Sequence, residues 1–204
     1  MKLKALEMQL ERIAGFDHPR VDLEQYVTPA AVAARLLHHA YLRSDIGGKR
    51  VCDLGCGTGI LCCGASLLGA SAAAGIDIDP AAVAAAQRNA TALGVSVQTM
   101  VGDIRDPGAL SSICPCDTVV MNPPFGAQKR HADRPFIDAA LSCAGVVYGI
   151  FNEGSRAFLS GYIRGRGEID EVTACAFPMR RTFAHHTRDR VEIPVEVVRI
   201  LRVG

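Results

Sequence analysis

A glycine-rich turn between a strand-like segment and a helix-like segment constrains the fold of this chain most strongly. Residues 50–54 predict a strand and residues 60–68 predict a helix. Gly55, Gly57 and Gly59 lie between them with the spacing G-x-G-x-G, whereas a dinucleotide-binding turn has the spacing G-x-G-x-x-G. Glycines at this position let the backbone approach a ligand closely at the start of a helix. The turn therefore predicts an α/β fold with a ligand site at the end of its first strand.

Strand-like and helix-like segments alternate along the rest of the chain. The hydrophobic patterns predict strands at residues 50–54, 72–76, 95–101, 117–121, 146–151, 170–178 and 191–203. They predict helices at residues 3–14, 29–41, 60–68, 80–93, 134–144 and 155–164, with Gly15 ending the first and Thr28 as the N-cap of the second. We therefore expect one α/β domain over residues 45–204, preceded by an N-terminal helical extension over residues 1–44.

The length and the apolar content indicate one large globular domain. The chain has 204 residues, of which 49% are hydrophobic, and this is enough for a substantial single core. Each apolar run is interrupted well before the roughly 20 residues that a membrane-spanning helix needs. The first residues include acidic and amide side chains, where a signal peptide would need an unbroken apolar stretch. We therefore expect a cytoplasmic protein without a membrane partner.

Eight cysteines form no regular framework in the sequence. Only Cys114-Pro115-Cys116 approaches a metal-binding pattern, and a zinc site needs four well-spaced ligands, usually with C-x₂₋₄-C pairs. The simpler interpretation is that the cysteines are small, reduced thiols packed in the core. No metal site is expected.

Asn122-Pro123-Pro124-Phe125 follows the predicted strand at residues 117–121. The two prolines fix φ and remove two backbone donors, so the turn is stiff and its carbonyls are free to accept hydrogen bonds. An amide side chain and an aromatic ring are thereby held at the end of the strand. Such a site can accept hydrogen bonds from an exocyclic amine while a planar ring stacks on Phe125. A proline-rich turn without a chemical role is the alternative.

Acidic residues close the two neighbouring strands. Asp77 ends the second strand, twenty positions after Gly57, where a carboxylate can hold the hydroxyls of a ribose. Asp103 follows the third strand. The glycine turn, these two acids and the Asn-Pro-Pro-Phe motif form an ordered set at the ends of four successive strands.

This ordered set resembles the motifs of class I S-adenosylmethionine-dependent methyltransferases. The matching segments are residues 53–59 (DLGCGTG), 75–79 (GIDID), 102–103 (GD) and 122–125 (NPPF), and the last form is typical of enzymes that methylate exocyclic or amide nitrogens. Residues 23–28 (LEQYVT) and the last strand are similar to the methyltransferase-like protein 5 family and its archaeal relatives, which are rRNA adenine-N6 methyltransferases. The resemblance implies a single Rossmann-like domain with seven strands in the order 3-2-1-4-5-7-6, the last one antiparallel.

The resemblance also implies roles for individual residues. S-adenosylmethionine is the expected cofactor, and the residues expected to bind it are Gln25, Thr28, Asp53, Gly55, Gly57, Gly59, Asp77, Ile78, Asp103, Ile104 and Asn122. Within this set, Asp77 is expected at the ribose and Asp103 at the amino group of the adenine. Asp53 has a structural alternative, since its carboxylate could instead organise the glycine turn. The expected catalytic residues are Asn122, Pro123, Pro124 and Phe125.

Two basic segments flank the expected site. Lys129 and Arg130 follow the Asn-Pro-Pro-Phe motif, and Arg181, His186 and Arg188 lie between the last two strands. We expect these side chains to contact the phosphates of structured RNA, small-subunit rRNA in particular, although a solvated charged surface is the alternative.

Three other functions compete with RNA methylation. Methyltransferases of protein glutamine amides use the same motif but usually carry a larger N-terminal helical domain. DNA adenine methyltransferases normally add a target-recognition domain, for which 204 residues leave little room. A non-catalytic cofactor-binding module is expected to lose the glycines or the Asn-Pro-Pro-Phe motif, and both are intact.

The resemblance finally implies a small zinc-ribbon methyltransferase activator protein that pairs along an exposed sheet edge. Residues 95–101 form the edge strand in the implied order and contain neither Lys nor Pro, the residues that commonly block edge pairing. A loop or a homodimer contact covering this edge is the alternative.

Overall fold

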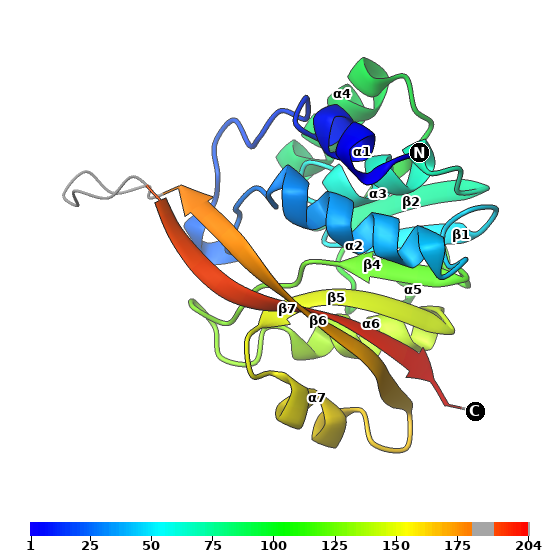
Figure 1. Cartoon of the computed structure of the whole chain (residues 1–204), viewed down its shortest axis with the longest axis vertical. Coiled ribbons are helices and arrows are strands. Elements are labelled where there is room, and N and C mark those ends of the chain that lie inside the picture. The colour runs from blue at the N-terminus through cyan, green and yellow to red at the C-terminus, as the bar shows by residue number, and fades with distance from the viewer. Residues whose placement is uncertain (181–189, 204) are drawn as a thin grey trace.

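The computed structural model describes residues 1–180 and 190–203, so Arg181, His186 and Arg188 lie outside the described residues. Seven strands form one sheet: β1 (Arg50–Leu54), β2 (Ala72–Asp77), β3 (Gln98–Val101), β4 (Thr118–Met121), β5 (Val146–Asn152), β6 (Gly167–Arg180) and β7 (Arg190–Arg202). Their order is β3-β2-β1-β4-β5-β7-β6 (Figure 1). β1 pairs in parallel with β2 and β4, whereas β7 is antiparallel to β5 and β6. The expected strand order and the antiparallel last strand are confirmed.

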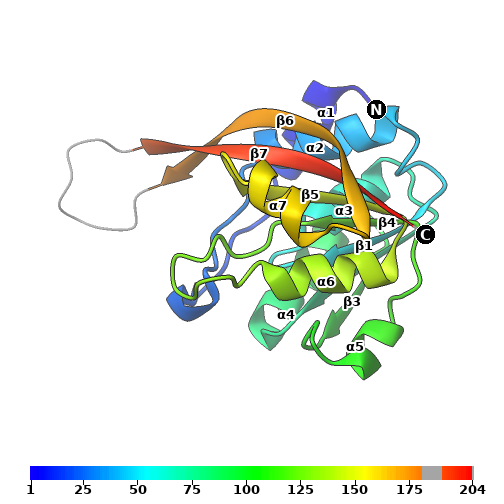
Figure 2. The same ribbon diagram turned by 90° about the horizontal axis from the view of Figure 1, so that it is seen from below.

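Helices cover both faces of the sheet (Figure 2). They are α1 (Leu3–Leu10), α2 (Ala30–Leu42), α3 (Ile60–Leu67), α4 (Pro80–Leu93), α5 (Pro107–Ser111), α6 (Arg134–Cys143) and α7 (Arg156–Tyr162), with a 3-10 turn η1 at Val21–Leu23. One apolar core lies between α1, α2, α3 and the sheet, and a second lies between α5, α6, α7 and the opposite face.

The central strands are buried on both faces, which explains why their sequences are almost continuously apolar. Side chains of a strand alternate between the two faces of its sheet. Val51 and Val120 accordingly belong to the first core, whereas Cys52, Leu54 and Val119 belong to the second. β1 and β4 therefore pair in the interior of the molecule, covered on both faces. The polar residues at their C-terminal ends lie close together as a result.

Helix α1 ends at Leu10, four residues before the predicted end. The chain leaves the helix because Ala14 docks on α4. The side-chain amide of Asn89 accepts a hydrogen bond from the Ala14 nitrogen at 3.0 Å and donates one to the Ala14 carbonyl at 3.0 Å. A tertiary contact thus overrides the local helical pattern.

The prediction of Thr28 as an N-cap is wrong. Helix α2 begins at Ala30, with Pro29 in the capping position and no side-chain capping bond. The Thr28 hydroxyl instead accepts a hydrogen bond from the side chain of Asn122 at 2.9 Å. A long-range polar contact has taken the place of the local cap.

The third strand is shorter than predicted and a short helix follows it. β3 begins at Gln98 rather than at residue 95, because the Val95 nitrogen donates to the Ala90 carbonyl at the end of α4 and the Ser96 carbonyl accepts from the Ser66 hydroxyl. Helix α5 was not predicted, although its start carries a recognisable signal. Asp106 accepts a hydrogen bond from the Gly108 nitrogen at 2.9 Å, and Pro107 is the first helical residue.

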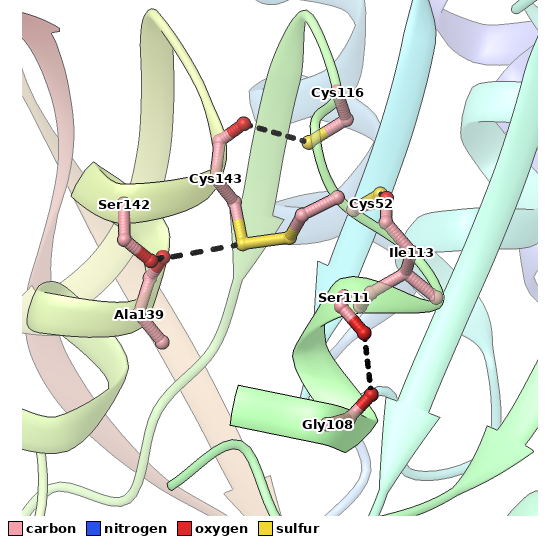
Figure 3. The surroundings of a disulfide bond; sticks show 9 residues. Cys52, Gly108, Ser111, Ile113, Cys116, Ala139, Ser142 and Cys143 are labelled. Carbon is pink, nitrogen blue, oxygen red and sulfur yellow. Dashed lines mark hydrogen bonds between the residues drawn. A yellow bond between two sulfur atoms is a disulfide. The ribbon is translucent and has the colours of Figure 1, made fainter. Parts of the chain in front are cut away.

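Cys114 and Cys143 form a disulfide (Figure 3), so the expectation of reduced thiols is wrong for this pair. Cys143 ends α6 beside the loop that leads into β4, which brings the two Cα atoms within 5.1 Å. The same contact is held by the Cys116 nitrogen, which donates to the Cys143 carbonyl at 3.1 Å. The disulfide closes a loop with a sequence separation of 29, a length for which a cross-link contributes about 3–4 kcal/mol of stability.

Within residues 1–180 and 190–203, no group of three or more His, Cys, Asp or Glu side chains is placed to hold a metal ion. No helix in the same part of the chain combines the length and the apolar character that crossing a membrane requires.

Candidate active site

A cavity of about 290 Å³ opens at the C-terminal ends of β1, β2 and β4. This is the edge of a parallel sheet at which α/β folds bind ligands. The structure brings together at this cavity most of the residues expected from the sequence: Gln25, Thr28, Asp53, Gly55, Gly57, Asp77, Ile78, Asp103, Ile104, Asn122, Pro124 and Lys129.

Four expected site residues lie apart from the cavity lining. Gly59 starts α3, and a Cβ at this position would come within 2.9 Å of Ala86 on α4. Pro123 is buried beneath the lining, and Phe125 is half-buried against the first core. Arg130 is exposed on the loop beyond the motif. Gly59 therefore serves helix packing, and the motif reaches the cavity through Asn122 and Pro124.

The glycine turn is closed by two aromatic rings that the sequence analysis did not identify. Gly55 has φ +70°, and a Cβ at this position would lie 2.7 Å from the ring of Phe136. Gly57 has φ +52°, and a Cβ there would lie 3.0 Å from the ring of Phe16. Both rings line the cavity. Glycine is required at these positions by its left-handed conformation and by these close contacts.

Asp53 supports the start of α3 from below the cavity. Its side chain is 1% exposed, and one carboxylate oxygen accepts a hydrogen bond from the Cys62 nitrogen at 3.1 Å. Burial raises the pKa of Asp53 to about 7. The carboxylate thus binds the backbone at the start of α3, and Asp53 also lines the cavity.

Asp77 links the end of β2 to the glycine turn. Its carboxylate accepts hydrogen bonds from the Gly57 nitrogen at 2.8 Å and from the Asp79 nitrogen at 2.9 Å. Burial raises the pKa of this carboxyl group, and the two backbone donors oppose that shift. A carboxylate oxygen can accept two hydrogen bonds, and each oxygen of Asp77 is given one here. Asp77 therefore retains acceptor capacity toward the cavity.

Asp103 is paired with Arg105, which the sequence analysis did not identify. The guanidinium Nε donates to one carboxylate oxygen of Asp103 at 2.9 Å and to the other at 3.0 Å. Hydrogen bonding from Arg105 lowers the pKa of Asp103. Both side chains line the cavity, so the acid expected at an adenine amino group carries a basic neighbour.

Asn122 presents a buried acceptor to the cavity. Its side-chain nitrogen donates to the Thr28 hydroxyl at 2.9 Å, and this bond fixes the orientation of the amide. Among the residues that the structure describes, the side-chain oxygen Oδ1 has no hydrogen-bond partner, although it is buried. A buried acceptor without a donor costs about 1–3 kcal/mol, so this oxygen marks a place where a ligand donor fits.

An aromatic pair stands beside Asn122. The rings of Tyr26 and Phe125 lie 5.4 Å apart with an interplanar angle of 34°. Tyr26 lines the cavity and Phe125 supports it from behind. Burial raises the pKa of the Tyr26 phenol above its ordinary value. The sequence motif pointed to Phe125 alone as the aromatic residue.

The geometry agrees with comparisons to known proteins. The family model described as ribosomal protein L11 methyltransferase (PrmA) matches residues 35–122, which span β1 to β4 and the start of the motif. A crystal structure of a Pyrococcus horikoshii protein proposed to be an RNA methyltransferase has a TM-score of 0.90 and 34% identity, and covers 100% of this chain and 99% of that one.

Two relatives match over nearly their whole length. The rRNA N6-adenosine-methyltransferase Mettl5 of Drosophila melanogaster is 36% identical over 96% of this chain and 94% of its own. METTL5 of Danio rerio is 31% identical over 98% of both chains. The chain therefore belongs to the METTL5 family of rRNA N6-adenosine-methyltransferases, which use S-adenosylmethionine as methyl donor.

Proposed function

We propose that this protein acts in the cytoplasm and transfers a methyl group from S-adenosylmethionine to N6 of an adenosine in structured RNA, small-subunit rRNA in particular. The observation that carries the proposal is the buried Oδ1 of Asn122, which lacks a donor in the described part of the chain and lies at the cavity. An exocyclic amine supplies the N–H that this oxygen requires. Family membership supports rRNA as the source of that amine.

The residues at the cavity fit S-adenosylmethionine, which supplies an activated methyl group on its sulfonium sulfur. The turn at Gly55 and Gly57 has positive φ and exposes backbone to the cavity. We assign it to the methionine part of the cofactor, and Asp77 to the ribose hydroxyls. Ile78 and Ile104 offer apolar contacts for the adenine, next to Asp103.

The chain's own contribution to the reaction is positioning. The lone pair of an adenine N6 is delocalised into the ring, so the amine is a weak nucleophile while it is planar. Oδ1 of Asn122 accepts one N–H group of the amine in a direction that favours a tetrahedral nitrogen. This acceptor stabilises the transition state more than the planar ground state. Tyr26 and Phe125 supply an aromatic wall, and stacking on such a ring contributes about 1–3 kcal/mol per base.

Basic side chains beside the cavity suit an RNA substrate. Lys129 lines the cavity and Arg130 is exposed on the same loop. β6 runs parallel to β5 because both are antiparallel to β7, so the connection from β6 to β7 leaves the sheet at the edge where the cavity opens. The two strands extend beyond the rest of the sheet at that end (Figure 1). We propose that Arg181, His186 and Arg188 of this connection contact RNA phosphates.

Transfer of labelled methyl groups to rRNA, tRNA, DNA and a release factor in parallel tests the proposal. Analysis of the products is expected to show N6-methyladenosine in small-subunit rRNA. Labelling of a glutamine in the release factor, or of DNA alone, would contradict the proposal and support the protein-amide or the DNA alternative.

Replacing Asp77 with Ala is expected to weaken S-adenosylmethionine binding more than tenfold. Loss of a charged hydrogen-bond partner typically costs about 1.5–3 kcal/mol, which corresponds to this change in affinity. Isothermal titration calorimetry measures the effect. Asp106→Ala is the matched control, because Asp106 also accepts a backbone hydrogen bond but lies at the start of α5 outside the cavity lining. Equal affinity for wild-type protein and Asp77→Ala would rule out the ribose assignment.

We also propose that a small zinc-ribbon methyltransferase activator pairs along the edge of the sheet at β3. This strand is the terminal one of its sheet, and Val101 is 49% exposed. Purification from the native organism is expected to recover the partner at equal stoichiometry. Val101→Lys places a charge on the edge and is expected to release it while S-adenosylmethionine affinity stays unchanged. A fully active protein that purifies without any small companion would rule out this partner.

A further inference from the structure

The 24–28 segment runs alongside the loop that follows β4. Thr28 contacts Asn122 through the hydrogen bond of 2.9 Å, and two residues earlier the ring of Tyr26 packs against Phe125 at 5.4 Å. As the segment runs back from Thr28 to Tyr26, its partners advance from Asn122 to Phe125, so the two stretches run antiparallel and their contacts form a ladder.

Glu24 supplies the third rung of this ladder. Its carboxylate accepts hydrogen bonds from two backbone nitrogens of the loop, that of Gly126 at 3.1 Å and that of Gln128 at 2.8 Å. Hydrogen bonds from backbone N–H groups to an ionised carboxylate are about twice as strong as neutral ones. Glu24 makes these two hydrogen bonds although its own backbone has a left-handed conformation, with φ +51°. This conformation is unfavourable for a residue with a Cβ and points to a constraint stronger than local preference.

The opposite side of the segment reaches the cofactor side of the cavity. Between Glu24 and Tyr26, the Gln25 amide donates to the carboxylate of Asp79 at 2.7 Å. Asp79 in turn donates its backbone nitrogen to Asp77. The segment thus connects the end of β2 with the loop after β4.

We propose that Glu24 is a positioning residue for methyl transfer: it anchors the loop at residues 126–128, so that the preceding motif presents Oδ1 of Asn122 to the reacting amine. The inference rests on the proposed role of Asn122. Two prolines make residues 122–125 stiff, so the loop moves with its anchor rather than bending between Asn122 and Gly126. Misplacement of a reacting group by about 1 Å costs about 10²-fold in rate. Glu24 also lines the cavity, but its carboxylate binds the loop backbone, and its effect on the rate passes through Asn122.

Glu24→Gln and Glu24→Gly test the proposal. Gln keeps the length of the side chain but replaces one acceptor oxygen with an amide NH₂ group, which cannot accept a hydrogen bond from the loop nitrogens. Gly removes the carboxylate and relieves the left-handed backbone, so its stability is expected to stay close to that of the wild type. In both variants we expect kcat to fall ten- to hundredfold, with the dissociation constant for S-adenosylmethionine changed less than threefold. A purely structural role would lower the melting temperature and cofactor affinity together with kcat.

Asp17→Asn is the matched control, since Asp17 is an exposed carboxylate of the same N-terminal segment that pairs with Arg88 on α4. Its kcat is expected to equal that of the wild type. A kcat within twofold of wild type in both Glu24 variants overturns the proposal, as does a loss of cofactor binding that parallels the loss of rate. Methyl transfer by the wild-type protein distinguishes a failure of this proposal from a failure of the proposed function on which it rests. If it transfers no methyl group to adenosine, the proposed function fails, whereas normal transfer with unimpaired Glu24 variants contradicts the positioning role alone.

Discussion

Asn122→Ala is expected to reduce methyl transfer about 10²–10³-fold, by analogy with the loss of one preorganised hydrogen-bonding group in an oxyanion hole. The substitution removes the buried Oδ1, which lacks a donor among the described residues and is free for the reacting amine. The affinity for S-adenosylmethionine is expected to stay within a few-fold, because Asn122 lies at the end of β4, whereas the carboxylates assigned to the adenosine lie at the end of β2 and after β3. Single-turnover kinetics with rRNA and calorimetry with the cofactor measure the two quantities separately.

Thr28→Val separates the acceptor from the group that orients it. The Thr28 hydroxyl accepts the hydrogen bond from the Asn122 amide, so its loss leaves Oδ1 present but free to rotate away. One hydrogen bond contributes about 0.5–1.5 kcal/mol, and the rate is therefore expected to fall only about two- to tenfold.

Gln87→Ala is the control for Asn122→Ala, because it removes an exposed side-chain amide on α4. An Asn122→Ala protein that retains more than a tenth of wild-type activity would contradict the catalytic role.

The parts of the site that the sequence predicts are those encoded by short segments at strand ends. Gly55 and Asn122 directly follow strands with clear apolar patterns, and Asp77 ends another. Parallel strands bring their C-terminal ends to one edge. The patterns of the individual strands predict this convergence without any knowledge of side-chain packing. The strand order itself followed from the family resemblance and is confirmed.

The parts that the sequence did not predict depend on contacts between distant segments. Phe16 and Phe136 close the glycine turn from the N-terminal segment and from α6, and no local pattern distinguishes them from other aromatic residues. The Cys114–Cys143 disulfide depends on the way α6 packs beside the loop before β4. Thr28 had a strong local signal as a helix cap, but the contact with Asn122 outweighed it. Packing at the tertiary level decided each of these cases.

A buried ionic network behind the site gives the largest expected effect on stability. Arg199 on β7 and Asp45 between α2 and β1 are each only 8% exposed. Nε of Arg199 donates to the Asp45 carboxylate at 3.0 Å, and the Tyr148 hydroxyl of β5 donates to the same oxygen at 2.7 Å. Nη1 of Arg199 also donates to Asp170 on β6 at 2.7 Å. The network ties α2 to the strands that carry the basic connection.

Arg199→Leu is expected to lower the free energy of unfolding by about 3–5 kcal/mol, because it leaves the Asp45 carboxylate buried without its cationic partner. For a domain of this size the melting temperature should fall by about 6–20 °C. Denaturant titration and calorimetric melting measure both quantities. The network lies away from the cavity lining, so the folded variant is expected to bind S-adenosylmethionine with wild-type affinity.

Two further variants identify the cause of this loss. Arg88→Leu removes a comparable ion pair whose side chains are 60% and 74% exposed, and it is expected to cost less than about 1 kcal/mol. Asp45→Asn in the Arg199→Leu background removes the unpaired charge while keeping an acceptor for the Tyr148 hydroxyl. We expect it to recover part of the lost stability, because the cost arises from an uncompensated buried carboxylate rather than from the packing of Arg199. If the double variant is instead less stable than Arg199→Leu alone, the loss comes from packing and the electrostatic explanation fails.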